Sequence, residues 1–386
     1  MKSIVKSRKI NIDKIYNLPK KVEFCKKCVI SNQRPRINFD SEGVCAACRY
    51  FEYKKTINFK KREEELLKLL DKNRSKNSNY DCVVPSSGGK DSAYVAHELK
   101  HKYGMNPLTV TWSPLVYTDI GFKNLIGFNK AGFDVIMGMM RGDVTRRLCR
   151  DATIEMGDPF QPFIYGQTLF PMKTAAEYNI KLVFAGENAM AEYGGPKDKW
   201  NKSHISISEY EETWFSNYAV NFWLKKGYKK SELQLIDSEY FKKNSKIKKY
   251  FYGYFRNWSN HSNYYYAKKN TNFTPNPERT EGTFTKYSSI DDKLDTFHHW
   301  FSLLKFGISR CTANAAREVR EGFRTRNEAI ALVKRYDQEF PKKYYRDFLE
   351  FTGLSDKEFN IIADNWRNKK FWTKIKNKWH LNTNID

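Results

Sequence analysis

Residues 81–92 read Asp81-Cys82-Val83-Val84-Pro85-Ser86-Ser87-Gly88-Gly89-Lys90-Asp91-Ser92, and this stretch decides the fold. Its apolar first half predicts a buried strand over 81–86, and the apolar repeat after it predicts a helix over 91–103. A strand, a glycine turn and a helix start can hold a phosphate chain, because the first amides of a helix have no internal partners.

The residue types inside this turn suit an anionic ligand. Gly88 and Gly89 let the backbone approach closely, and Ser87 and Ser92 add hydroxyl donors. Asp91 would repel bare phosphate, so we expect it to hold a Mg²⁺ that bridges the phosphates. The spacing differs from a Walker A loop, which has four residues between its glycines.

Strands and helices alternate on both sides of this turn. Further strands are predicted over 107–112, 133–138 and 181–186, with helices over 119–131, 143–155 and 166–178. Such alternation predicts an α/β fold with a doubly wound parallel sheet, whose ligands bind beyond the carboxyl ends of the strands. From 200 to 283 this alternation is no longer visible, and the sequence is rich in aromatic residues, Asn and Lys. Helices are predicted again over 289–306, 327–336 and 357–366.

Four of the seven cysteines form two Cys-x-x-Cys pairs, Cys25 with Cys28 and Cys45 with Cys48. Their spacing predicts a four-cysteine zinc ribbon, and four thiolates leave no open position, so the zinc is expected to be structural. Two disulfides would give the same pattern but do not suit a reducing compartment. We therefore divide the chain into a basic arm and ribbon (1–55), a nucleotide-binding domain (56–200) and an aromatic-rich and helical region for substrate or partner (201–386).

Composition limits the partners and the compartment. The 386 residues carry 68 Lys and Arg against 44 Asp and Glu, which gives a net charge of +24. This charge indicates either anionic partners or a merely solvated basic surface, and the composition favours neither over the other. No apolar run is long enough to span a membrane, and the first residues lack a signal-peptide core. A cytoplasmic protein is expected.

Two further groups are candidates for chemistry. Glu187 and Glu192 follow the last predicted strand, where they either hold a metal or steer an amine, or cap a helix. Asp292, Asp295 and His299 lie at i, i+3 and i+7 of the predicted helix, hence on one face. They either move protons or serve as partners of the helix dipole.

The Ser-Gly-Gly-x-Asp-Ser pattern resembles the PP-loop of the ATP pyrophosphatases, which cut ATP between its α and β phosphates. More specifically, the chain resembles the N-acetyl sugar amidotransferases of surface-polysaccharide and flagellar-sugar pathways. The matching segments are the four-cysteine segment, 85–92, Gly186-Glu187-Asn188 with Glu192-Tyr193-Gly194-Gly195, Arg279-Thr280-Glu281-Gly282, 289–293 and 305–307.

This resemblance implies an activity. It implies that the acetamido oxygen of an N-acetylated sugar, expected to be nucleotide-activated, is adenylated and then replaced by ammonia to give an acetamidino sugar, AMP and pyrophosphate. The residues implied to bind ATP are Ser87, Gly88, Gly89, Lys90, Asp91, Ser92 and Gly186. Lys90, Asp91, Glu187 and Glu192 are implied to be catalytic, and the substrate residues would be Arg279, Glu281, Asp292, Asp295 and His299.

The resemblance also implies partners. Residue 2 is Lys2, and Cys82, Cys149 and Cys311 lie in no nucleophile elbow, so no glutaminase is evident in this sequence. We expect a separate glutaminase and an ammonia-conducting barrel as partner subunits.

Two other functions fit parts of the sequence. A PP-loop enzyme that thiolates tRNA would use a zinc ribbon, a basic surface and exposed aromatics, but thiolation needs a reactive or clustered cysteine. A zinc-ribbon nucleic-acid binder with a decayed loop is the non-enzymatic alternative, against which the intact Ser-Gly-Gly-Lys-Asp-Ser argues.

Overall fold

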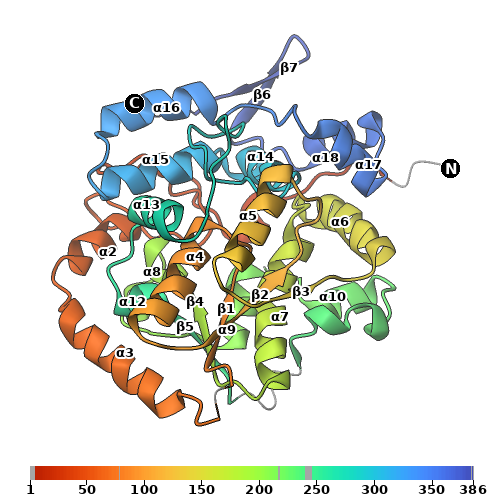
Figure 1. Ribbon diagram of the computed structural model, residues 1–386. Helices are drawn as coiled ribbons and strands as arrows, with labels where there is room; N and C mark the ends of the chain where they lie inside the picture. Colours follow the sequence, from red (N-terminus) through yellow and green to blue (C-terminus); the bar gives the residue numbers. More distant parts are fainter. Residues whose placement is uncertain (1–4, 78, 216–217, 240–245, 384, 386) are drawn as a thin grey trace.

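A five-stranded parallel sheet forms the centre of the molecule (Figure 1). The computed structural model describes residues 5–77, 79–215, 218–239, 246–383 and 385. The strands follow the order β3-β2-β1-β4-β5. Their bounds are Cys82–Pro85 (β1), Pro107–Trp112 (β2), Val135–Gly138 (β3), Leu182–Ala185 (β4) and Lys248–Phe251 (β5). The predicted α/β class and parallel sheet are confirmed.

Alternate residues of β1 and β4 enter two different cores. Val83 and Val183 pack on one face with α6 (Gly142–Met156) and α7 (Gln161–Glu177). Cys82 and Val84 pack on the other face with α3 (Phe59–Asn73) and α4 (Lys90–His97). Because successive side chains of a strand point to opposite faces, the apolar run of β1 is buried on both sides.

The connections contain the remaining helices of the first half. A π-helical turn continues α4 over Glu98–Lys102 (η1), and α5 (Asp119–Lys130) joins β2 to β3. Ahead of the sheet come α1 (Ile12–Tyr16) and α2 (Ala46–Lys54). The helix continued by η1 and the helix α5 agree closely with the ranges 91–103 and 119–131 expected from the apolar periodicity, whereas α1 and α2 were not predicted.

The aromatic-rich segment after β4 forms short elements rather than a separate sheet. They are α8 (Ala189–Glu192), η2 (Lys197–Lys199), α9 (Ile207–Trp214), α10 (Val220–Lys225), η3 (Lys230–Glu232), η4 (Gln234–Ile236), α12 (Tyr252–Phe255) and α13 (Asn260–Asn270). This segment also supplies β5, which the sequence did not reveal. Its four residues pair along β4, Lys248 with Leu182 through Phe251 with Ala185.

The C-terminal region is mostly helical, as predicted, and ends in a small hairpin. It contains α14 (Asp295–Phe306), α15 (Arg310–Arg320), α16 (Arg326–Tyr336), α17 (Tyr345–Thr352), α18 (Asp356–Asn365), β6 (Trp372–Ile375) and β7 (Lys378–Leu381). Figure 1 shows these blue elements gathered at one side of the molecule. They share a single apolar core with the four-cysteine segment, so the two ends of the chain fold against each other.

One predicted boundary is wrong. The helix expected from residue 289 begins at Asp295, and Asp292 lies before it in the loop. Asp292 accepts hydrogen bonds from the amides of Leu115, Val116 and Leu294, so it ties this loop to the end of β2. Asp292 therefore does not share a helical face with Asp295 and His299.

Candidate active site and metal centre

The glycine turn after β1 lies where the strand order of the sheet reverses. The chain moves from β1 to β2 on one side, and β4 lies on the other side of β1. In open α/β sheets this switch point forms a crevice beyond the carboxyl ends of the strands. A cavity of about 430 Å³ opens there, lined by residues 85–87 and 89–92, by Gly186 and Glu187 after β4, and by α15. We call it the loop cavity.

The turn itself needs glycine at its second position. Gly88 has φ of +78°, and a Cβ there would lie 2.7 Å from the backbone of Asn124 in α5. The Gly88 amide donates to Ser86 Oγ at 3.2 Å, and Ser86 Oγ is 3.0 Å from Ser92 Oγ. Hydrogen bonds of its own serine hydroxyls thus stabilise the turn, and its backbone packs closely against α5.

The first amides of α4 face the loop cavity without a cap. Gly89 occupies the N-cap position, and no side chain accepts a hydrogen bond from the first turn. Uncapped amides at a helix start bind anions, since their partial positive charge adds to the helix dipole. The structure therefore has the donor arrangement that a phosphate chain requires.

Lys90 and Asp91 begin α4 and form an ion pair with each other. Asn263 of α13 donates to Asp91 Oδ1 at 3.0 Å, and the Lys90 ammonium lies 5.6 Å from the Tyr287 ring centre. Burial lowers the pKa of Lys90, against the opposing effect of Asp91. Asp91 suits Mg²⁺ as a single carboxylate, because Mg²⁺ is usually held by one or two carboxylates together with substrate phosphates and water.

Asp291 also lines the loop cavity, although it was not among the site residues predicted from the sequence. Burial and the neighbouring Asp295 raise the pKa of Asp291, against a hydrogen bond from Ser87. The Asp291 backbone lies so close to Gly121 of α5 that a Cβ on that glycine would be 2.5 Å from the Asp291 Cα. A carboxyl group is thereby held beside the phosphate-binding turn.

A second cavity of about 560 Å³ adjoins the loop cavity, and we call it the arginine cavity. The two share wall residues, among them Gly186, Glu187, Tyr193 and Arg317. Seven cationic side chains line it, namely Arg34, Arg36, Lys249, Lys305, Arg310, Arg317 and Arg320. The carboxylates in its wall are Asp158, Glu187 and Asp295, so the wall is strongly cationic.

Glu187 stands on the boundary between the cavities. It follows β4, and the Tyr193 hydroxyl donates a hydrogen bond to its Oε1. The guanidinium of Arg34 lies 4.5 Å from the Tyr193 ring centre, and that of Arg317 lies 5.6 Å from it. Gly186 needs its small size, because a Cβ there would lie 2.7 Å from the Trp258 ring. Glu187 is thus a carboxylate that a ligand in either cavity would meet.

Two histidines of α14 line the arginine cavity, and their pKa values are shifted in opposite directions. His298 Nδ1 lies 2.8 Å from Asp158 Oδ1; burial opposes its charge, but Asp158 outweighs that effect and raises the pKa of His298. Burial and then Arg310 hold the pKa of His299 well below its ordinary value. A neutral His299 accepts a hydrogen bond from Arg310 Nη1 at 3.3 Å through its Nε2. Asp295 Oδ1 lies 3.6 Å from the same nitrogen.

Other predicted site residues lie apart from both cavities. Glu192 forms a buried ion pair with Lys54 of α2, at 2.9 Å. Arg279 pairs with Glu339 at 2.6 Å, and it lines a separate hollow together with Glu281. These contacts tie the residues to neighbouring elements, and their catalytic and substrate roles stay predictions.

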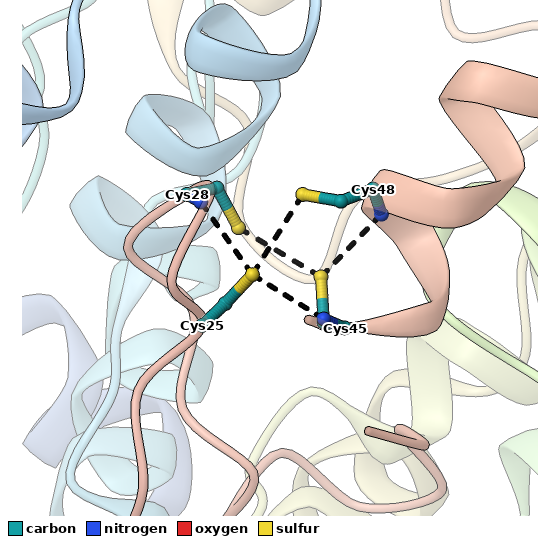
Figure 2. A group of neighbouring side chains, drawn as sticks. All are labelled: Cys25, Cys28, Cys45 and Cys48. Carbon is teal, nitrogen blue, oxygen red and sulfur yellow. Dashed lines mark hydrogen bonds between the residues drawn. The ribbon is translucent and has the colours of Figure 1, made fainter. Parts of the chain in front are cut away.

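The four cysteines of the N-terminal segment form a compact cluster (Figure 2). All four sulfur atoms are buried and lie within 4.8 Å of one another. Cys25 Sγ is 3.8 Å from Cys48 Sγ, and Cys28 Sγ is 3.8 Å from Cys45 Sγ. Zinc bound to four thiolates at about 2.3 Å gives neighbouring sulfur atoms about 3.8 Å apart. The cluster therefore fits a closed tetrahedral Zn²⁺ site.

Backbone amides complete the cluster. The amide of Cys45 donates to Cys25 Sγ at 3.3 Å, and the amide of Cys48 donates to Cys45 Sγ at 3.4 Å. Arg320 Nη1 lies 3.9 Å from Cys28 Sγ. These donors stabilise thiolate charge and orient the sulfur atoms inward.

The three remaining cysteines are buried and line neither cavity. Burial raises the pKa of the Cys82, Cys149 and Cys311 thiols. A sulfur carrier needs an accessible thiolate, so the structure offers none of these residues for that chemistry.

Comparison with known proteins supports the resemblance to surface-polysaccharide proteins for the C-terminal part of the chain. Residues 281–385 match the family described as LPS biosynthesis protein WbpG-like, C-terminal domain. This span includes α15, which lines both cavities, and α14, which lines the arginine cavity, and it covers well under half of the chain. The similarity therefore concerns the helical region.

A second match is to an uncharacterized protein of Methanocaldococcus jannaschii. The two are 32% identical over 87 residues, which is 22% of this chain and 31% of the archaeal protein. The chain thus matches about a third of that relative's length.

Sequence reasoning missed much of the arginine cavity. Arg310, Asn314 and Arg317 face the cavities from α15, and their spacing of four and seven residues was a readable helical signal. Lys249 gave no such signal, because β5 itself was missed. Arg34 and Arg36 follow the first cysteine pair, and their place in the cavity wall depends on how the four-cysteine segment packs.

Proposed function

We propose that the chain is an ATP-dependent amidotransferase that converts the acetamido group of an N-acetylated sugar into an acetamidino group. We expect the acceptor to be nucleotide-activated, and the other products to be AMP and pyrophosphate. The observation that carries the proposal is a pair of adjoining cavities, one at the Ser-Gly-Gly-Lys-Asp-Ser turn and one with a cationic wall. In this proposal ATP occupies the first cavity and the acceptor occupies the second.

The chemistry needs two consecutive substitutions. The acetamido oxygen attacks the α-phosphorus of ATP, the bond to the β-phosphate oxygen breaks, and pyrophosphate leaves. Ammonia then attacks the activated carbon, and AMP leaves with the former acetamido oxygen. The nitrogen loses a proton to give the amidine, which is cationic at neutral pH once protonated on its second nitrogen. Activation is required because an amide oxygen is otherwise a poor leaving group.

The turn residues have distinct tasks in this scheme. The uncapped amides of α4, Ser87 and Ser92 bind the phosphate chain, and Lys90 neutralises charge that develops as pyrophosphate leaves. Mg²⁺ bound by Asp91 would screen the phosphates. Glu187, on the boundary between the cavities, stabilises the cationic amidine.

Ammonia is proposed to come from partner subunits, a glutaminase and an ammonia-conducting barrel. The three cysteines outside the metal cluster are buried and line neither cavity, so they do not serve as a glutaminase nucleophile. The match of residues 281–385 to an LPS biosynthesis domain supports a place in surface-glycan synthesis. Among the residues that the structure describes, no helix has the length and apolar character to span a membrane.

The decisive experiment follows the acetamido oxygen. Purified protein is incubated with ATP, Mg²⁺, ammonium chloride and N-acetylated sugars, including UDP-N-acetylglucosamine and N-acetylneuraminic acid labelled with heavy oxygen at the acetamido carbonyl. Mass spectrometry is expected to find the label in AMP and a product in which NH replaces oxygen. Formation of ADP and orthophosphate, or pyrophosphate release that depends on tRNA, would contradict the proposal.

A further inference from the structure

The four-cysteine segment forms part of the wall of the arginine cavity. The lining residues lie between the two cysteine pairs and are Ile30, Arg34, Pro35 and Arg36. The segment is also bonded to the loop after β4, because the Asn38 amide donates to the Gly194 carbonyl at 3.2 Å. The four-cysteine segment is therefore part of the wall of the candidate acceptor site.

Helix α15 connects the metal cluster to the same cavity from the other side. Its last residue, Arg320, lies 3.9 Å from Cys28 Sγ and also lines the arginine cavity. One turn earlier, Arg317 faces both cavities. Arg326, after the helix, donates from Nε to the Cys28 carbonyl at 3.3 Å. The first cysteine pair thus holds the C-terminal end of α15.

Several of these cations have no acidic partner. Among the described residues, no carboxylate lies within ion-pair distance of Arg34, Arg36 or Arg317. Arg34 and Arg36 instead lie over aromatic rings, those of Tyr193 and Trp214. Lys249 is buried and lies 4.7 Å from the Tyr210 ring centre. Unpaired cations grouped around one cavity are costly unless an anion joins them.

We infer that the four-cysteine segment positions an anion-binding site in the arginine cavity. With metal bound, it fixes Arg34 and Arg36, and through Cys28 also Arg320, where they bind an oxyanion group of the acceptor. The identification of the ligand as the sugar acceptor rests on the proposed function. The anion site itself rests on the cavity and its unpaired cations.

The test measures binding instead of turnover. The full-length zinc-loaded protein is first saturated with α,β-methylene-ATP and then titrated calorimetrically with UDP-N-acetylglucosamine or N-acetylneuraminic acid. The first probe offers a diphosphate and the second a carboxylate, so the probe that binds identifies the source of the anion. We expect Arg34→Gln, Arg36→Gln and Arg320→Gln each to weaken binding of that probe about tenfold or more, because each loses a charge-assisted contact.

The control is Lys26→Gln, which removes one positive charge from an exposed position between Cys25 and Cys28. It is expected to bind the probe as wild type does. Zinc content measured on every variant shows whether the metal is retained. Removal of zinc by a chelator is expected to weaken binding of the probe more than binding of the ATP analogue, which depends on α4.

Three results would overturn the inference. They are failure of the zinc-loaded wild type to bind either probe, unchanged affinity in Arg34→Gln and Arg36→Gln, or probe binding that survives loss of zinc. Failure of the proposed function appears differently, as absent binding of the ATP analogue or absent AMP formation. The two failures are therefore distinguishable.

Discussion

Asp91 is the residue whose replacement tests the adenylation chemistry most directly. Asp91→Asn keeps the side-chain size and the hydrogen bond with Asn263 but removes the charge that we assign to Mg²⁺ binding. AMP formation is expected to fall by about a hundredfold or more, as for loss of a group that stabilises phosphoryl charge. Initial rates of pyrophosphate release at several Mg²⁺ concentrations check this. A variant with the native rate at all of them would contradict the role of Asp91.

Lys249 predicts a dependence of stability on pH. Burial lowers the pKa of Lys249 from 10.5 to about 8, against the opposing effect of Glu187. Between these values the unfolded chain binds more protons than the folded protein, so the contribution of this residue to stability rises with pH. Below pH 8 the full penalty of burying the charge is present, and it is lost as pH rises through the unfolded value.

Lys249→Met is therefore expected to stabilise the ligand-free protein at pH 7 by about 1–3 kcal/mol. The difference in unfolding free energy between variant and wild type should shrink toward zero by pH 10.5. Urea unfolding of both proteins at pH 7 and at alkaline pH measures it. A variant that is less stable than wild type at pH 7 would contradict the assignment of Lys249 as an unpaired buried cation.

The turn between β1 and α4 is the element on which the proposed nucleotide binding depends. Gly88→Ala is expected to abolish binding of the ATP analogue, because its Cβ meets the backbone of Asn124 and its φ is positive. Gly227→Ala separates the two causes, since Gly227 has φ of +90° with nothing within 4 Å of an added Cβ. The control is expected to lose about 1 kcal/mol of stability and to bind the analogue normally. Calorimetry and thermal unfolding of both variants decide this.

The hydrophobic periodicity and the cysteine spacing predicted those elements whose structure is determined by neighbouring residues in the sequence. The strand expected over 107–112 matches β2 residue for residue, and the cysteine spacing predicted a cluster that the structure forms. β5 was not predictable, because its four residues carry two lysines and are a strand through pairing with β4. The aromatic-rich segment around it therefore looked irregular.

The candidate site was predictable where it is continuous in sequence. Residues 86–92 and Glu187 follow strand ends, and strand ends of a parallel sheet meet at one edge. Arg34, Lys249 and Arg317 come from three distant segments, and what brings them together is packing between the ends of the chain. No local pattern contains that information. Asp292 was misplaced for a related reason, since its buried carboxylate serves a loop contact across the fold.

At the scale of the whole molecule, the four-cysteine segment and the C-terminal helices form one core. Cys25 and Cys48 belong to the same buried cluster as Phe297 and Leu304 of α14 and Ala316 of α15. The division of the chain at residues 55 and 200 remains a prediction. What the packing shows is that the first of these regions is buried against the last.

Loss of the metal is accordingly expected to loosen the C-terminal helices. Cys45→Ser should reduce zinc content and increase hydrogen exchange in α14 and α15, because structural zinc contributes directly to folding free energy. Cys311→Ser is the control, since Cys311 is equally buried in α15 but distant from the cluster. Exchange measured by mass spectrometry in both variants tests this. Increased exchange confined to the first 55 residues of Cys45→Ser would contradict the shared core.

The shared core also fixes the order in which a new chain can mature. The cysteine pairs are translated before the helices that bury them. Until those helices are made, the four-cysteine segment lacks this packing partner, and the wall of the arginine cavity is incomplete. A chain cut short before α15 would contain the glycine turn but not the complete wall of the neighbouring arginine cavity, so it would lack part of the proposed acceptor site.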